Sequence, residues 1–331
     1  MRIGVIGAGA VGGTLAALLD RAGQTVEVTA RGAHLGAIQA DGLRLEGGWG
    51  EHTARVRAGE TLTREPEFVI LATKAQDARS ALEANKLAIR SVPVLVVQNG
   101  LGGLRIAREV LPSAPLLGGL ALMAVSYLQP GVVTVTTPQP LIVGAAPDTN
   151  ASMLERVAEV LRPAIPVEIT DDISGAQWTK LLINHINALP AITGLPVQEV
   201  VADNGLRRIM AASMRETVQL ARQLGVRFGK VQGVSGRVLN LLGAVPLSVG
   251  ETFPRLLARR LGEVPNPGST LQSIRRGQLT EIDYLNGAVV AEATAHGLEA
   301  PINAQLVELV HEVERTRSFF SPADVVERIP V

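Results

Sequence analysis

The feature that most constrains this chain is a glycine-rich run near its start. It follows an apolar strand-like segment, Arg2–Ile6, opens a helical pattern at Ala10–Ala22, and consists of Gly7, Ala8, Gly9, Ala10, Val11 and Gly12. In a strand–turn–helix unit the three glycines permit a tight turn, close backbone approach to a pyrophosphate, and tight helix packing. The helix N-terminus offers unpaired N–H groups and a positive dipole to phosphates. This context predicts a dinucleotide site rather than a glycine turn without a ligand.

The rest of the first half alternates short apolar runs with helical patterns. The predicted strands are Thr25–Thr29, Phe68–Ala72, Val94–Val97 and Leu116–Gly119. Several are apolar at every position, which is typical of parallel strands buried on both faces. Two further segments, Val132–Thr136 and Leu141–Gly144, follow a Pro-Gly turn and read as an antiparallel addition near the sheet edge.

The second half has helical periodicity and few strand-like runs. Apolar residues recur at three- and four-residue spacing in Ala176–Thr193, Leu206–Leu224, Leu279–Ala295 and Ile302–Arg317. We therefore expect a Rossmann-type α/β NADP-binding domain at residues 1–171. An all-α domain for substrate binding and dimerisation is expected at residues 172–331.

Composition narrows the function classes. The 331 residues include 31 basic and 31 acidic side chains and no cysteine, so a disulfide scaffold, a thiolate metal site and a cysteine nucleophile are excluded. The balanced charge argues against nucleic acid as a partner. No metal site is expected from only five histidines. With no leader-like segment and no apolar run long enough for a membrane helix, we expect a cytoplasmic protein without a membrane partner.

The end of the second predicted strand indicates the cofactor variant. NAD enzymes usually place an acidic residue there to bind the ribose 2′-hydroxyl. This strand instead ends in Thr-Ala followed by Arg31, whereas Glu27 lies too early to be its tip. A guanidinium matches phosphate bidentately, so Arg31 favours the 2′-phosphate of NADP over a role as a solvated loop charge.

Three polar residues interrupt an otherwise apolar helical pattern in the second half. At spacings of four and seven, Lys180, Asn184 and Asn187 would share one face of a regular helix. Only four of the 31 basic residues are lysine, so a lysine at this position suggests a role that arginine cannot fill. Lysine can release its proton when its environment lowers its pKa.

An ordered set of motifs resembles the ketopantoate reductase (2-dehydropantoate 2-reductase) family over nearly the whole chain. Besides the glycine run, it comprises Ala72-Thr73-Lys74, Gln98-Asn99-Gly100-Leu101-Gly102, Trp178-Thr179-Lys180-Leu181 with Asn184, Asn266-Pro267-Gly268-Ser269, and Thr280-Glu281-Ile282-Asp283-Tyr284-Leu285-Asn286-Gly287. The resemblance implies a helical domain like the C-terminal domain of 6-phosphogluconate dehydrogenase. It also implies NADPH-dependent reduction of ketopantoate to (R)-pantoate, a step of pantothenate and coenzyme A biosynthesis.

The resemblance also implies residue roles. Lys180 would be the general acid that protonates the ketone oxygen, and Glu281 its helper near the nicotinamide ribose. Further cofactor positions would be Lys74, Asn99 and the backbone around Ala124. The substrate-contacting positions would be Lys180, Asn184, Asn187, Asn266 and Ser269.

The chain departs from the family pattern beside the lysine. The family's second asparagine usually lies eight residues after the lysine, where this chain has Ala188, and Asn187 comes one residue early. A further family asparagine aligns with Val197. His185 adds a titratable group that either faces the pocket or, as we favour, packs between helices. His34, in a polar segment, is expected to be solvated.

These departures leave alternatives to ketopantoate open. One is another branched 2-keto acid, and another is a 3-hydroxy acid dehydrogenase of the 6-phosphogluconate-like superfamily, which shares the lysine–asparagine pair. A third is a non-catalytic NADPH-sensing protein, against which Lys180, Asn184 and Glu281 together speak. The apolar helices make a homodimer plausible.

Overall fold

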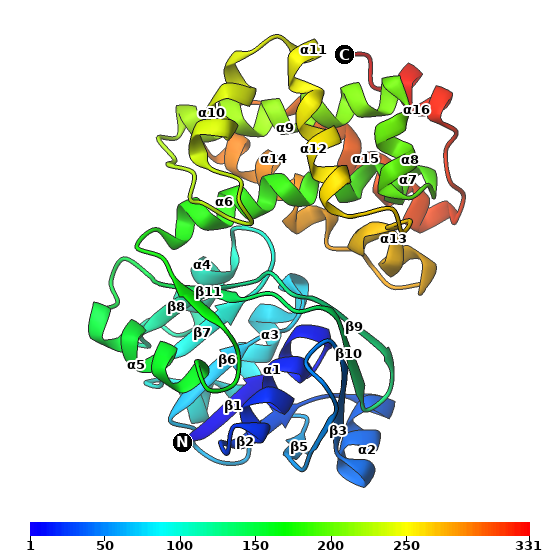
Figure 1. Cartoon of the computed structure of the whole chain (residues 1–331). Coiled ribbons are helices and arrows are strands. Elements are labelled where there is room, and N and C mark those ends of the chain that lie inside the picture. Colours follow the sequence, from blue (N-terminus) through cyan, green and yellow to red (C-terminus); the bar gives the residue numbers. More distant parts are fainter. The chain divides into compact units, whose positions relative to one another are not determined.

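The structure, a computed structural model, describes residues 1–331, and the chain divides into two units, Met1–Ile173 and Ser174–Val331. An eight-stranded sheet forms the centre of the first unit (Figure 1). In spatial order its strands are β12 (Val167–Ile169), β11 (Leu141–Ala145), β8 (Leu116–Ala121), β7 (Val94–Val97), β6 (Phe68–Leu71), β1 (Arg2–Ile6), β2 (Thr25–Thr29) and β5 (Arg57–Gly59). All neighbours from β8 to β5 are parallel, whereas β11 runs antiparallel to β8. The predicted parallel sheet and the antiparallel strand at 141–144 are confirmed.

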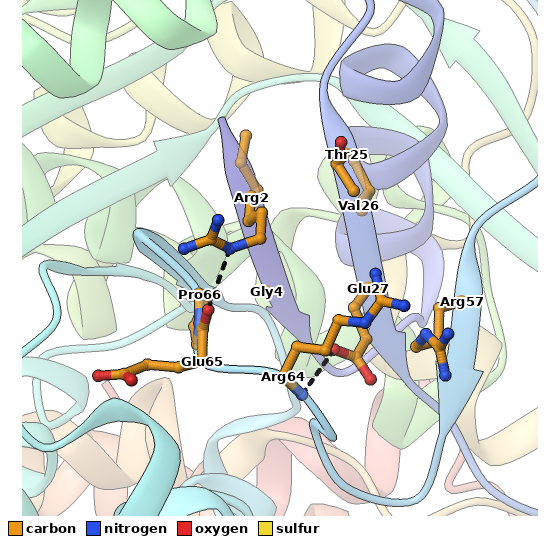
Figure 2. A pocket seen from close by; sticks show the side chains of 10 residues that line it. Arg2, Gly4, Thr25, Val26, Glu27, Arg57, Arg64, Glu65 and Pro66 are labelled. Carbon is orange, nitrogen blue, oxygen red and sulfur yellow. Dashed lines mark hydrogen bonds between the residues drawn. The ribbon is translucent and has the colours of Figure 1, made fainter.

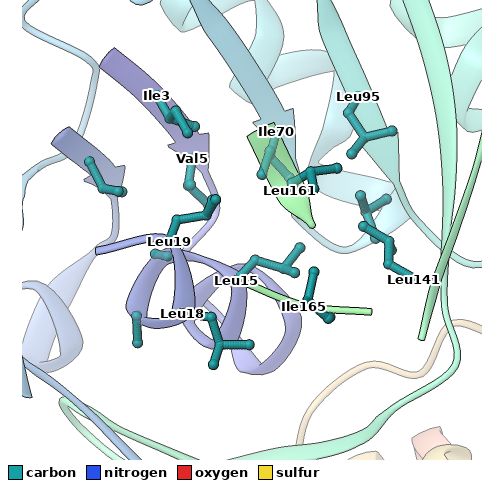
Figure 3. Close-up of a cluster of buried hydrophobic side chains, with 14 of the residues drawn as sticks. Ile3, Val5, Leu15, Leu18, Leu19, Ile70, Leu95, Leu141, Leu161 and Ile165 are labelled. Carbon is teal, nitrogen blue, oxygen red and sulfur yellow. The ribbon is translucent and has the colours of Figure 1, made fainter. Parts of the chain in front are cut away.

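Both faces of the central strands are buried, as their uninterrupted apolar runs predict. In β1, Ile3 and Val5 belong to one hydrophobic cluster, whereas Ile6 belongs to another on the opposite face. The same alternation occurs in β6 and β7. Figure 3 shows the first cluster, in which Leu15 and Leu19 meet strand residues such as Val5. Because successive side chains of a strand point to opposite faces of the sheet, one set of strands contributes to two hydrophobic cores.

Helices complete the first unit. They are α1 (Ala10–Arg21), α2 (Gly32–Asp41), α3 (Ala78–Ile89), α4 (Gly103–Val110), α5 (Ala151–Leu161) and the 3₁₀ turn η1 (Ala75–Asp77). Buried side chains of α3 and α4 join the cluster on one face of the sheet, and those of α1 and α5 join the cluster on the other.

A second sheet of four strands packs against α1. Its order is β4 (His52–Ala54), β3 (Leu43–Gly47), β10 (Val132–Thr137) and β9 (Ala124–Gln129). The strand expected at 132–136 exists, but its assignment to the main sheet was wrong. Val133 and Val135 are buried while the threonines between and after them are more exposed, so this strand has one apolar face, which covers α1.

The second unit is helical, apart from one isolated bridge between Val231 and Val234. The long helix α9 (Asn204–Gln223) contacts most of the others. The remaining helices and turns are α6 (Ile173–Asn184), η2 (His185–Asn187), α7 (Ala188–Thr193), α8 (Val197–Ala202), α10 (Gly236–Ala244), α11 (Leu247–Gly250), α12 (Thr252–Arg260), α13 (Gly268–Arg275), η3 (Ile282–Tyr284), α14 (Asn286–Ala295), α15 (Pro301–Thr316) and α16 (Pro322–Arg328). The α/β plus all-α fold class is confirmed. No helix of the structure has the length and apolarity that crossing a membrane requires.

Two of the predicted helices differ from the structure. The segment 176–193 is not one helix, because the α-helix ends at Asn184, a 3₁₀ turn follows, and a new helix contains Pro190 in its first turn. Proline has no N–H to donate and its ring clashes with the carbonyl four residues earlier, so it is tolerated only near a helix start. The helix expected from Leu279 begins only at Asn286, which places Glu281 before it rather than on it.

Candidate active site

The glycine turn of the first unit has the geometry of a phosphate cradle. Gly7 has φ +96°, and a Cβ there would lie 2.8 Å from the backbone nitrogen of Thr73. A Cβ at Gly12 would collide with the carbonyl oxygen of Gly7, whereas one at Gly9 would meet nothing within 4 Å. The first turn of α1 has neither a side-chain cap nor an acidic residue. Its N–H groups and the open space at Gly9 therefore fit an anionic group such as a pyrophosphate.

The end of β2 anchors this turn. Thr29 accepts hydrogen bonds from the N–H of Gly7 to its hydroxyl, at 2.9 Å, and from the N–H of Ala8 to its carbonyl, at 2.8 Å. Two residues later, the exposed Arg31 occupies the N-cap position of α2. Because β1 and β2 are parallel neighbours, the carboxyl ends of both strands, and so the glycine turn and Arg31, lie at one edge of the sheet.

His34 is not solvated, and that expectation was wrong. The residue is 7% exposed, and Nε2 lies 2.7 Å from the carbonyl oxygen of Ala8, while Nδ1 accepts the N–H of Gly131 at 2.9 Å. The ring also packs on Tyr127, with centroids 4.3 Å apart. His34 thus connects the glycine turn to the loop between β9 and β10. Its sequence signal was weak because its contacts are distant in sequence.

The ends of β6 and β7 carry two further cofactor candidates, Lys74 and Asn99. Between them, buried Gln98 donates from Nε2 to the carbonyl oxygen of Thr73 at 2.9 Å, which joins the two strand ends. Both candidates are half-buried, and Gly100 follows with φ +83°. Ala124 is exposed at the start of β9, in the second sheet. Sequence reasoning named the motif around Gln98 but missed that it joins the strands.

The second unit brings Lys180, Asn184 and Glu281 into one neighbourhood. Lys180 and Asn184 are four residues apart on α6, and both are half-buried. Burial lowers the pKa of Lys180 from 10.5 to about 8, while the nearby Glu281 carboxylate acts in the opposite direction. A lysine with this pKa gives up its proton more readily than a solvated one, as a general acid near neutral pH requires.

The other predicted substrate residues organise a loop before α13. Asn187 accepts the N–H of Ser269 on its side-chain oxygen at 3.3 Å, and Asn266 accepts the N–H of Gly268 at 2.8 Å. Gly268 has φ +71°, and a Cβ there would collide with the Asn187 side chain. Ser269 is exposed at the start of α13. The two asparagines therefore hold the turn that presents Ser269.

The positions of the missing family asparagines lie in the core. Ala188 is 1% exposed and Val197 is fully buried, and both belong to the hydrophobic cluster of the helical unit. The 3₁₀ turn at 185–187 places Asn187, rather than residue 188, next to the loop of Ser269.

A small hollow of the first unit lies away from the glycine turn. It is lined by residues at the amino ends of β1, β2 and β5, among them Arg2, Thr25 and Arg57 (Figure 2). There, the buried Glu27 accepts the N–H and hydroxyl of Thr63 at 2.8 and 2.6 Å. Glu27 therefore anchors the segment before β6 and does not belong to the nucleotide edge of the sheet.

Comparisons with known proteins cover both units of the chain. The family model described as ketopantoate reductase PanE/ApbA matches residues 3–148, and the model of the C-terminal domain of the same family matches residues 172–314. A 2-dehydropantoate 2-reductase of Pyrococcus horikoshii is 30% identical over 95% of this chain and 98% of its own length. The chain belongs to the ketopantoate reductase family.

Solved structures place the same fold in this family. A PanE/ApbA family ketopantoate reductase from Ralstonia eutropha JMP134 has a TM-score of 0.83 and 31% identity, over 96% of this chain and 99% of the other. D-mandelate dehydrogenase, in a ternary structure with NADH and anilino(oxo)acetate, has a TM-score of 0.79 over 96% of this chain and 99% of the other. At 22% identity, the second likeness concerns the fold alone.

Proposed function

We propose that this protein reduces ketopantoate to (R)-pantoate with NADPH, a step of pantothenate biosynthesis. The observation that carries this proposal is a lysine with a lowered pKa beside Glu281, in a chain of the ketopantoate reductase family. A sensor that only binds a nucleotide has no use for such a proton donor. The 2-dehydropantoate 2-reductases to which the chain is similar cover nearly its whole length.

NADPH would be held by the first unit. The N–H groups at the start of α1 would bind the pyrophosphate, with Gly9 leaving room for it and Arg31 binding the 2′-phosphate. Lys74, Asn99 and the backbone around Ala124 would contact the rest of the cofactor. When bound, the nicotinamide supplies the hydride that is added to C2 of the keto acid.

The helical unit would supply the proton and bind the substrate. The negative charge that develops on the carbonyl oxygen is stabilised by the Lys180 ammonium, which then donates its proton to that oxygen. Glu281 keeps Lys180 protonated near neutral pH, since its charge opposes the effect of burial. Asn184, the amide N–H groups of Asn187 and Asn266, and the Ser269 hydroxyl would bind the carboxylate and hydroxyl of the substrate without adding charge.

The test is NADPH oxidation with ketopantoate, measured beside a panel of other 2-keto acids and beside oxidation of 3-hydroxyisobutyrate. We expect the highest kcat/KM with ketopantoate and NADPH. Faster turnover of another 2-keto acid would mean that this acid, and not ketopantoate, is the substrate. Faster hydroxyisobutyrate oxidation would favour the alternative of a 3-hydroxy acid dehydrogenase. A folded protein that binds NADPH but turns over none of these substrates would favour the alternative of a non-catalytic NADPH-sensing protein. A homodimer and a cytoplasmic location stay predictions.

A further inference from the structure

A chain of hydrogen-bonded polar side chains crosses the core of the helical unit, outside the residues assigned to the reaction. It includes His185 from η2, Ser213 and Glu216 from α9, Asn286 at the start of α14, and Asn303 at the start of α15. All except Glu216 are at most 2% exposed. Buried polar groups are costly unless they are paired, so such a network needs an explanation.

Glu216 sets the direction of the hydrogen bonds. Its carboxylate accepts the backbone N–H of Ile302 at 3.0 Å and both the backbone and side-chain N–H groups of Asn303, at 2.9 and 2.7 Å. The amide nitrogen of Asn303 therefore faces Glu216. Its oxygen in turn accepts from the Ser213 hydroxyl and from the Asn286 amide, each at 2.8 Å.

This direction determines the tautomer of His185. Because the single hydroxyl proton of Ser213 is donated to Asn303, the Ser213 oxygen accepts at 2.8 Å from Nδ1 of His185. His185 therefore carries its proton on Nδ1, and Nε2 lies 3.4 Å from the Thr217 hydroxyl. Burial lowers the pKa of His185 to about 3, so the ring is neutral at physiological pH. A neutral, fully buried ring is no proton donor for a substrate.

The two ends of this hydrogen-bond chain each lie five residues along the sequence after a member of the reactive pair. His185 directly follows Asn184, at the end of the helix that carries Lys180. Asn286 begins α14, five residues after Glu281, and its side-chain oxygen is a buried acceptor without a hydrogen-bond partner. Pairing that oxygen by reversing the amide would place two oxygens face to face at Asn303. The network thus holds two chain segments that carry the acid and its helper.

We infer that the chain His185–Ser213–Asn303–Asn286 positions Lys180 relative to Glu281, with His185 as a neutral positioning residue. The inference rests on the proposed function for its catalytic part. It explains why a histidine is accommodated five residues after the lysine: a neutral side chain with an N–H donor at the Nδ1 position completes the hydrogen-bond chain. Loss of this hydrogen-bond chain lets the distance between Lys180 and Glu281 grow. The Glu281 charge then raises the pKa of Lys180 less.

The first experiment measures the tautomer without any turnover. Ring ¹⁵N NMR of the whole protein, with the His185 signal assigned through His185→Asn, should show a neutral Nδ1–H ring at pH 7. Ser213→Ala should remove the Nδ1–H hydrogen-bond shift. A ring protonated at Nε2 in the wild type would overturn the inference, whatever the substrate proves to be.

The second experiment separates positioning from core stability. His185→Asn keeps an N–H at the Nδ1 position, whereas His185→Leu and Ser213→Ala break the chain. We expect a kcat at least tenfold lower in the two breaking variants and near the wild-type value in His185→Asn. The alkaline limb of the kcat–pH profile should move to lower pH in the two breaking variants, because the Glu281 charge then raises the pKa of Lys180 less.

A cavity variant in the same core, Val310→Ala, is the matched control. It should lower Tm without moving the alkaline limb. If His185→Leu and Ser213→Ala behave like Val310→Ala, with kcat and pH profile unchanged, the network is only structural and the inference fails. Wild-type protein that reduces no keto acid would contradict the proposed function instead, while leaving the tautomer result to stand.

Discussion

His34 Nε2 lies 2.7 Å from the carbonyl oxygen of Ala8, in the middle of the glycine turn. A carbonyl only accepts, so Nε2 carries the proton, and Nδ1 is free to accept from Gly131. One neutral ring therefore satisfies a donor and an acceptor from separate parts of the first unit. The glycine turn depends on a side chain that its own motif does not include.

This relationship predicts how two His34 variants differ. His34→Gln keeps a donor near Nε2 for Ala8, whereas His34→Asn keeps an acceptor near Nδ1 for Gly131. We expect His34→Asn to raise the Kd for NADPH by about 5–30-fold, one lost hydrogen bond being worth about 1–2 kcal/mol, and His34→Gln to raise it less. Fluorescence titration measures both. His52→Asn, which alters a histidine paired with Asp20 at 2.8 Å, is the control and should leave the Kd unchanged.

Alanine substitutions at two glycines of the same turn should have different effects on stability and on NADPH affinity. Gly9→Ala adds a Cβ where the protein has open space, so the free energy of unfolding should stay nearly constant while NADPH affinity falls at least about tenfold. Gly12→Ala forces a Cβ against the Gly7 carbonyl and should cost about 1–3 kcal/mol of stability. Urea denaturation and NADPH titration together distinguish them. Unchanged NADPH binding by Gly9→Ala would contradict the assignment of this turn to the cofactor site.

Arg31 should decide between NADPH and NADH. Arg31→Ser removes a guanidinium from the end of β2, so affinity for NADPH should fall by about 10–100-fold, as for a lost charge-assisted hydrogen bond, and affinity for NADH should hardly change. Arg57→Ser, at the amino end of β5, is the matched control. Equal losses for both cofactors in Arg31→Ser would mean that the arginine does not recognise the 2′-phosphate.

Lys180 predicts the pH dependence of the reaction. In its proposed role of general acid Lys180 must be protonated, and its pKa is about 8, so kcat should be flat below pH 8 and fall about tenfold per pH unit above it. Lys180→Arg cannot release a proton and should lower kcat by about 10²–10⁴-fold without raising the Kd for NADPH. Lys230→Met, at an exposed lysine of the same unit, should match wild type.

Lys180 should also cost stability. A lysine pKa lowered on folding means that the unfolded chain binds the proton more tightly, so the folded state is destabilised below pH 8, where both states are protonated. Lys180→Met should therefore raise the free energy of unfolding at pH 7 by about 1–3 kcal/mol. The gain should shrink as the pH rises from 8 towards 10.5. A gain that is equal at pH 7 and pH 10 would contradict this origin.

Local sequence alone determined the fold class and the main motifs. Uninterrupted apolar runs in β6 and β7 predicted a parallel sheet, because strands buried on both faces need apolar residues throughout. The glycine run lies between a strand and a helix in the sequence, and this context predicted the tight turn that connects them. The family motifs located Lys180 and Glu281, whose electrostatic coupling the structure then supplied.

Tertiary structure decided what depends on contacts between distant segments. The break of α6 after Asn184 had a local signal in Pro190, but the use of Asn187 to hold the Ser269 turn joins residues 82 positions apart. His34 looked solvated from its polar neighbours because its partners, Ala8 and Gly131, lie in other elements. Hydropathy patterns report which face of an element is buried. They do not report which hydrogen-bond donor meets which acceptor, since folding alone brings those groups together.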